Sequence, residues 1–157
     1  MNRVYTTKER ILQLCPPKTD TQSADWEATY WDDTIAWASE KVDTYVGPGY
    51  PLVYNDNKQR FPNVTDVPAT PALINETAAK FGSYRVGTRL KQVNQGRGED
   101  PIAIRNFNSA RKSCIEIKEG QSNIIIDGVD LTEATRPKVE YAAPDEVFSE
   151  EEFENLK

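Results

Sequence analysis

The chain has 157 residues, a net charge of −6 and no histidine. Hydrophobic residues make up 38% of it and the mean hydropathy is −0.68, so we expect one domain with a modest core and appended segments that lie in water. The absence of histidine removes the commonest general acid–base group and the commonest metal ligand. Cys15 and Cys114 stand alone, without zinc-site spacing, so we expect no metal and no cofactor and interpret both as small buried residues of a reducing compartment.

The negative charge lies at the C-terminal end. Residues 140–157 contain seven acidic residues and one lysine, which leaves 18 acidic and 18 basic residues in residues 1–139 (25 − 7 and 19 − 1). A neutral body does not present the basic face that general nucleic-acid binding requires. The chain shows neither a secretory signal nor an apolar run of membrane-spanning length, so we expect a cytosolic protein without membrane contact.

The first predicted element is a short helix that ends at Pro16 and Pro17. Thr6 and Glu9 have the spacing of a capping box at its start. A second helix is predicted over residues 25–46. Its apolar residues recur every three or four positions and form one face: Trp31, Ile35, Ala38, Val42 and Tyr45.

Three more aromatic residues of this region, Trp26, Tyr30 and Trp37, lie partly off that face. One interpretation places them in the buried core. The other makes them anchors of a subunit interface, because Trp and Tyr dominate the energetics of protein–protein contacts. The neighbouring acids Asp32 and Asp33 are interpreted as a solvated helix face.

A long loop, residues 50–69, separates this helix from the next and is a candidate interaction arm. The third helix is predicted from Pro71 to about Leu90, with Thr70 as its N-cap. Glycine at position 82 weakens this helix but permits a neighbour to approach closely. The face predicted for the third helix is Ile74, Ala78, Phe81 and Tyr84 or Arg85.

The fourth helix is predicted to start at Asp100 and Pro101 and to stop at Glu119 and Gly120. A short strand within residues 122–126 and a turn follow it. The apolar face predicted for this helix is Phe107, Ala110, Cys114 and Ile117. The fold class expected is therefore mainly α: a small bundle of about four helices with a long inter-helix loop, a short β element and an extended C-terminal tail.

We divide the chain into a helical domain, residues 1–131, and an extended acidic tail, residues 132–157. Residues 137–157 are expected to be disordered in the free monomer. The tail carries four large apolar residues among its acids, a mixture typical of a peptide that orders on a partner. They are Val147, Phe148, Phe153 and Leu156. The basic residues of the body, Arg85 and Arg89 among them, are interpreted as scattered surface charges that a ring would repeat around a lumen.

Residues 38–46, Ala-Ser-Glu-Lys-Val-Asp-Thr-Tyr-Val, are followed by Tyr50 and Pro51. This order resembles a pattern of the head–tail connector (adaptor, or head completion) proteins of tailed bacteriophages. In these proteins a helix ends in a Ser-x-x-Ile-Asp-x-Tyr-Leu-like segment, and a Tyr-Pro element, a loop and a proline-initiated helix follow. The resemblance covers about residues 6–128.

The resemblance implies a virion protein, assembled in the host cytoplasm, that forms a ring of about twelve subunits between portal and tail. Such a ring extends the DNA channel, lets double-stranded DNA pass without reading its sequence, and provides a docking surface for tail or stopper proteins. By analogy, the four apolar tail residues would contact the portal or the next subunit, and Lys58 and Arg60 are candidates to line the channel. No enzymatic activity is expected.

Two other functions compete with this one. The first is a DNA-binding or packaging accessory protein, which would need a contiguous basic face. A small enzyme would need a pocket with convergent carboxylates, and the sequence shows no clustered nucleophile.

Overall fold

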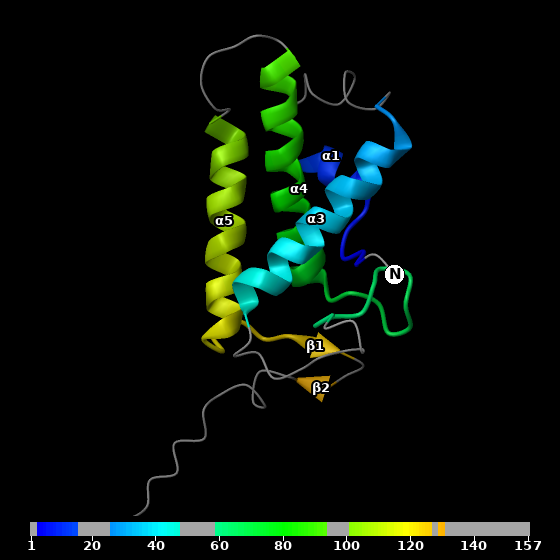
Figure 1. Cartoon of the computed structure of the whole chain (residues 1–157). Helices are drawn as coiled ribbons and strands as arrows, with labels where there is room; N and C mark the ends of the chain where they lie inside the picture. Colours follow the sequence, from blue (N-terminus) through cyan, green and yellow to red (C-terminus); the bar gives the residue numbers. More distant parts are fainter. Residues whose placement is uncertain (1–2, 16–25, 48–58, 94–100, 127–128, 131–157) are drawn as a thin grey trace, which may run out of the picture.

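A computed structural model of the chain describes residues 3–15, 26–47, 59–93, 101–126 and 129–130. Within them the chain forms four helices and one pair of short strands (Figure 1). The elements are α1 (Lys8–Leu14), α3 (Ala28–Val46), α4 (Ala72–Val93), α5 (Pro101–Lys118), β1 (Ile125–Ile126) and β2 (Val129–Asp130). The predicted mainly α class, a small helical bundle with a short β element, is confirmed. Lys58 and the predicted tail, residues 132–157, lie outside the described residues.

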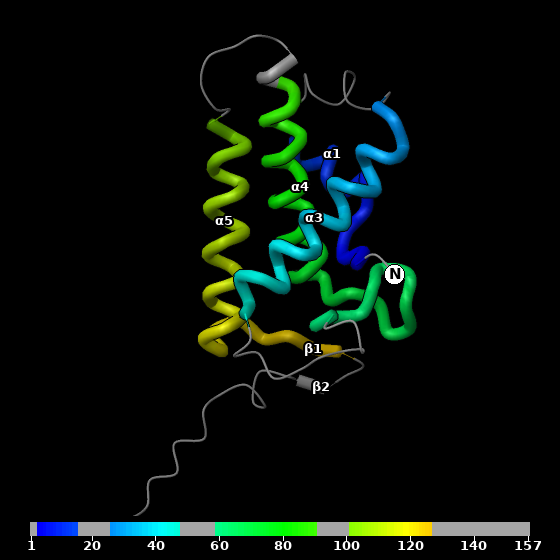
Figure 2. Tube along the Cα trace, in the orientation of Figure 1, coloured from blue at the N-terminus to red at the C-terminus, as the bar shows by residue number. Residues whose placement is uncertain are grey.

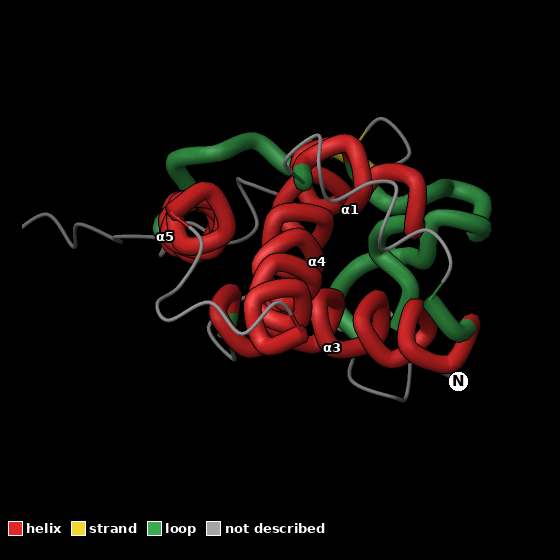
Figure 3. Tube along the Cα trace, turned by 90° about the horizontal axis from the view of Figure 1, so that it is seen from above, coloured by secondary structure: helices red, strands yellow, loops and turns green. Residues whose placement is uncertain are grey.

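Helix α4 is the centre of the bundle. Helix α5 runs antiparallel beside it, and α3 crosses it obliquely (Figure 2). Viewed from above, α1, α3 and α5 surround α4 (Figure 3). The strands β1 and β2 lie beyond the end of the bundle at which α4 begins and α5 ends (Figure 1).

The N-cap of helix α1 lies one residue later than the capping box predicts. Thr7, not Thr6, is the N-cap, and its hydroxyl oxygen accepts from the backbone N–H of Arg10 at 3.3 Å. The hydroxyl of Thr6 is buried and donates to the Oδ1 atom of Asn75 at 3.0 Å. The capping-box prediction is therefore wrong by one position, because a tertiary contact with α4 takes the Thr6 side chain.

Helix α3 begins at Ala28, three residues after the predicted start, and ends at Gly47, where φ is +75°. A left-handed glycine at this position is the usual way to end a helix. The predicted apolar face is confirmed: Trp31, Ala38 and Val42 are buried, and the other two members are half-buried.

Helix α4 begins at Ala72, so the predicted cap and first turn are one residue too early. The hydroxyl of Thr70 donates to the carbonyl oxygen of Pro62 at 2.6 Å and thereby holds the preceding loop. The close approach expected at Gly82 is confirmed. A Cβ atom there would lie 2.6 Å from Cδ1 and 2.8 Å from Cγ1 of Ile11, so α1 packs directly on the backbone of α4.

Helix α5 begins at Pro101, as predicted, and its chain turns at Gly120 with φ of +69°. Three of its four predicted core positions are buried and Phe107 is half-buried. The strand β1 is shorter than expected, and its partner β2 was not predicted from the sequence. The two pair antiparallel, with Ile125 opposite Asp130.

The buried side chains form two clusters. The larger cluster joins α3, α4 and α5 with the N-terminal segment and the loop around residue 61; its largest members are Tyr5, Phe61, Phe81, Ile74 and Ile117. The smaller cluster joins α1 to α3 and α4 and consists of Ile11, Cys15, Trp31, Ala79 and Val86. Both cysteines are buried, as predicted.

Candidate functional site

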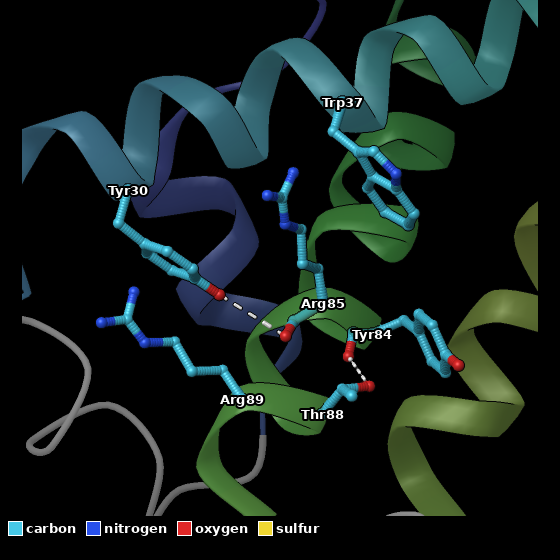
Figure 4. Close-up of a pocket in the computed structure, with 6 residues that line it drawn as sticks. All are labelled: Tyr30, Trp37, Tyr84, Arg85, Thr88 and Arg89. Atoms are coloured by element: carbon cyan, nitrogen blue, oxygen red, sulfur yellow. Dashed lines mark hydrogen bonds between the residues drawn. The ribbon is translucent and has the colours of Figure 1, made fainter. Parts of the chain in front are cut away.

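A groove with a volume of about 490 Å³ opens along the seam between α3 and α4. Its walls combine aromatic rings, two guanidinium groups and the side chain of one threonine (Figure 4). We call it the α3–α4 groove. It is lined by Tyr30, Trp37, Tyr84, Arg85, Thr88 and Arg89.

Helical spacing brings these residues to one seam. Arg85 and Arg89 stand four residues apart on α4, and so do Tyr84 and Thr88, so each pair follows one ridge of the helix. On α3, Tyr30 and Trp37 stand seven residues apart, or two turns, and face α4 (Figure 4). The groove is therefore built from side chains of two helices, α3 and α4.

The two arginines lie against the aromatic rings. The guanidinium carbon of Arg89 is 3.9 Å from the ring centroid of Tyr30 and 4.5 Å from that of Trp26. The guanidinium carbon of Arg85 is 5.5 Å from the ring centroid of Trp37, and its Nη1 atom donates to the carbonyl oxygen of Asp33 at 3.0 Å. Such cation–π contacts hold the charged groups in defined positions.

Neither guanidinium forms an ion pair with a carboxylate of the described residues. Both arginines are half-buried, so their positive charges are partly shielded from water. Burial also raises the pKa of the Tyr30 hydroxyl, against the lowering effect of Arg89 and Arg85. The groove thus offers two fixed positive charges beside apolar ring surface.

This arrangement suits the recognition of an anionic group that carries an apolar or aromatic neighbour. Guanidinium groups bind carboxylates or phosphates through paired hydrogen bonds, and the rings accept an apolar or aromatic group. The described residues that line the groove include no cysteine, serine, lysine, aspartate or glutamate. Among the residues that the structure describes, no group of three His, Cys, Asp or Glu side chains could hold a metal ion.

A second polar cluster is buried on the other side of α3 and is centred on Tyr5. The hydroxyl of Tyr5 donates to the Asp43 carboxylate at 2.9 Å and accepts from the backbone N–H groups of Arg60 and Phe61, at 3.1 and 3.2 Å. The backbone N–H of Tyr5 donates to the Ser39 hydroxyl at 2.9 Å. Through this single tyrosine, α3 fixes both the N-terminal segment and the loop that leads to α4.

Burial governs the electrostatics of this cluster. It raises the pKa of the Asp43 carboxyl from an ordinary value of 3.8 to about 6, while the Tyr5 hydrogen bond and the charges of Arg3 and Arg60 act in the opposite direction. The Nε atom of Arg3 lies 3.2 Å from the carboxylate. Burial, and after it the Asp43 charge, also raises the pKa of the Cys114 thiol. The cluster is enclosed by the fold, so we assign it a structural role.

The predicted interface residues fall on the α3–α4 seam. Tyr30 and Trp37 line the groove. The ring of Trp26 packs edge-to-face against that of Tyr30, with the ring centroids 4.8 Å apart. All three are half-buried. Their packing against α4 shows that they also stabilise the monomer, and their role in an interface stays a prediction.

The other predicted site residues are only partly described. Arg60 is half-buried in the loop before α4, where its charge acts on Asp43. Lys58 lies outside the described residues, as do the four apolar tail residues, Val147, Phe148, Phe153 and Leu156. The exposed acids Asp32 and Asp33 form a solvated helix face, as expected.

Sequence reasoning missed two features of this region. It treated Arg85 and Arg89 as scattered charges, although their spacing of four residues after an aromatic residue marks one helical ridge. It also missed that Ser39 and Asp43, again four residues apart, bind a single N-terminal tyrosine. The first signal was present in the local pattern, whereas the second required knowledge of which distant segment packs on α3.

Comparison of the chain with known protein families, with curated proteins and with solved structures finds no match. None of the helices within the described residues is long and apolar enough to cross a membrane.

Proposed function

We propose that this chain is a structural adaptor of a tailed bacteriophage virion. In this proposal, copies of the chain form a ring between portal and tail that extends the DNA channel and offers a docking surface to tail or stopper proteins. The observation that carries the proposal is the α3–α4 groove, whose aromatic and arginine side chains have the composition of protein–protein hot spots.

The residues that carry the connector resemblance have a clear physical role, which supports the proposal. Ser39 and Asp43 of the Ser-x-x-Ile-Asp-like segment both bind Tyr5, and Tyr5 in turn holds the backbone at Arg60 and Phe61. The segment that carries the resemblance therefore has a structural role in this fold.

A binding role also agrees with the chemistry of the groove. Its two arginines are held by ring contacts and lack a carboxylate partner among the described residues. A neighbouring subunit or the portal could supply carboxylates to them and cover the rings. Burying such residues in an interface stabilises the assembly more than the same area of ordinary surface would.

The proposal is tested by co-sedimentation of the full-length chain with the purified portal of the same phage. Trp37→Ala removes the largest ring of the groove and should weaken portal or ring binding at least tenfold, as expected for a hot-spot residue. Arg105→Ala, an exposed residue of α5, is the matched control and should bind like the unmodified chain. Circular dichroism of both variants serves as the control that their helices are retained. Equal binding by both variants would remove the groove from the proposal.

One observation supports the alternative of a DNA-binding accessory protein: Arg85 and Arg89 lie beside aromatic rings in the groove. Single-stranded nucleic acids bind to surfaces that combine positive charge with stacking rings. Fluorescence anisotropy with short single-stranded and duplex DNA at two salt concentrations separates the candidates. Binding by the monomer that falls steeply with salt favours the accessory role, and no binding at low salt favours the adaptor.

A further inference from the structure

We propose that the α3–α4 groove is the binding site for the chain's own acidic C-terminal segment, residues 145–156. The proposal concerns the free subunit and does not rest on the adaptor function. It is carried by the match in charge and in apolar character between the groove and that segment, and by the length of the connecting chain.

The charges are complementary. Residues 145–156 contain six acidic side chains, Asp145, Glu146, Glu150, Glu151, Glu152 and Glu154, and no basic one. The groove presents two guanidinium groups that form no ion pair within the described part of the chain. Since arginine binds carboxylates through two parallel hydrogen bonds, the three consecutive glutamates 150–152 are the natural partners of Arg85 and Arg89.

The apolar groups are complementary as well. Phe148 and Phe153 flank the three glutamates in the sequence. In the groove, the rings of Tyr30 and Trp37 border the two guanidinium groups, and the ring of Tyr84 lies to one side of them (Figure 4). A segment with the order Phe, acids, Phe can therefore bring carboxylates to the arginines and rings to the rings, where edge-to-face contacts add to the burial of apolar area.

The connecting chain is long enough. The strand β2 ends at Asp130, beyond the end of the bundle where α4 begins (Figure 1). From there to the groove the segment must travel about the length of α4 between Ala72 and Arg89, roughly 26 Å at 1.5 Å per residue. Residues 131–144 span up to roughly 46 Å when extended.

Covalent connection favours a chain's own segment over that of a second copy. A short flexible linker holds a tethered ligand at an effective concentration on the order of millimolar, well above the concentration of other copies in a dilute solution. The free subunit would then cover the half-buried rings and arginines of the groove with its own tail. A partner that occupies the groove would release the tail, and a partner that takes the tail would uncover the groove.

Limited proteolysis of the full-length chain by a protease that cuts after glutamate tests the proposal. Cleavage within residues 150–154 is followed by intact mass. In the double variant Arg85→Gln/Arg89→Gln the tail should be cut about fivefold faster than in the unmodified chain, because two ion pairs to the segment are lost. The matched control Arg105→Gln/Lys118→Gln also removes two positive charges, both exposed on α5, and should leave the rate unchanged.

A variant outside the bundle makes the test independent of any effect on folding. Phe148→Ala/Phe153→Ala should accelerate cleavage to a similar extent, once its rate is divided by that of a synthetic peptide with the same substitutions. The combination of the groove and tail substitutions should be cut no faster than either alone, since both disrupt one contact. Cleavage at Glu27 and Glu40 of α3 and its preceding turn serves as the internal measure of folding.

Two results would overturn the proposal. The first is a tail that is cut at the same rate in the unmodified chain and in the groove variant. The second is a tail whose protection from proteolysis increases with protein concentration while the mass measured by light scattering also increases. This result would assign the groove to the tail of a second copy.

Discussion

Replacement of Tyr5 by phenylalanine removes one oxygen atom from the centre of the buried polar cluster. The ring can stay where it is, at 5.8 Å from the ring of Phe61, so the change isolates the hydroxyl. That hydroxyl serves three partners: it donates to Asp43 and accepts from the backbone N–H groups of Arg60 and Phe61.

The magnitude follows from these contacts. A hydrogen bond to a charged group contributes about 1.5–3 kcal/mol, and each buried group left without a partner costs about 1–3 kcal/mol, so with partial relaxation of the loop we expect a loss of about 3–5 kcal/mol. That is a large share of the roughly 5–15 kcal/mol that stabilises a typical domain. The loss should also raise the pKa of Asp43 further, because the Tyr5 hydrogen bond now lowers it.

Urea denaturation followed by circular dichroism measures the free energy of unfolding. Tyr84→Phe is the matched control, because this half-buried tyrosine borders the groove and its hydroxyl has no assigned partner in the described structure. The control should change the free energy of unfolding by less than about 0.5 kcal/mol. A loss below about 1 kcal/mol for Tyr5→Phe would refute the argument that this hydroxyl anchors the N-terminal segment and the loop to α3.

Three further predictions concern the body of the protein. Gly82→Ala should lower the free energy of unfolding by about 1–3 kcal/mol in urea denaturation, because the new Cβ atom would overlap Ile11, even though alanine favours helices. Adding Ile11→Val should recover part of this loss. If the two substitutions changed the free energy of unfolding additively, the direct contact would be contradicted. Folding raises the pKa of Asp43 to about 6, so protonation of this carboxyl favours the folded state below pH 4, and that contribution is lost as pH rises through about 6. Between pH 4 and pH 7.5, the free energy of unfolding of Asp43→Asn should therefore increase by up to about 3 kcal/mol relative to that of the unmodified chain. Stability curves that run parallel over this pH range would contradict the raised pKa. A thiol reagent at pH 8 should modify Cys114 only at the rate of unfolding, because the side chain is fully buried and its pKa is raised; immediate reaction without denaturant would show that the larger cluster opens.

The helices of this fold are largely encoded in local patterns. Proline and glycine punctuation together with three-to-four spacing located α3, α4 and α5 and their buried faces, because these signals depend only on residues within one or two turns. The exact first residues of the helices were harder to predict from the sequence. Thr6 and Thr70 look like caps in the sequence, yet their hydroxyls bind Asn75 and Pro62, partners that local reasoning does not see.

The candidate site was only half predictable. Its aromatic side, Tyr30 and Trp37, was recognised because the helix carries more apolar surface than one face can bury. Its charged side was not, since Arg85 and Arg89 belong to a different helix and only the crossing of α3 over α4 brings them to the rings. Ser39 and Asp43 belong to the segment that carries the connector resemblance, but their shared partner Tyr5 lies more than thirty residues away.

The proposed adaptor function is tested most directly by the mass of the full-length chain in light scattering, alone and then mixed with the purified portal of the phage that the proposal implies. The account predicts a small species alone and a complex with the portal that contains a fixed, ring-like number of copies. A chain that keeps the same mass in the presence of the portal would contradict it.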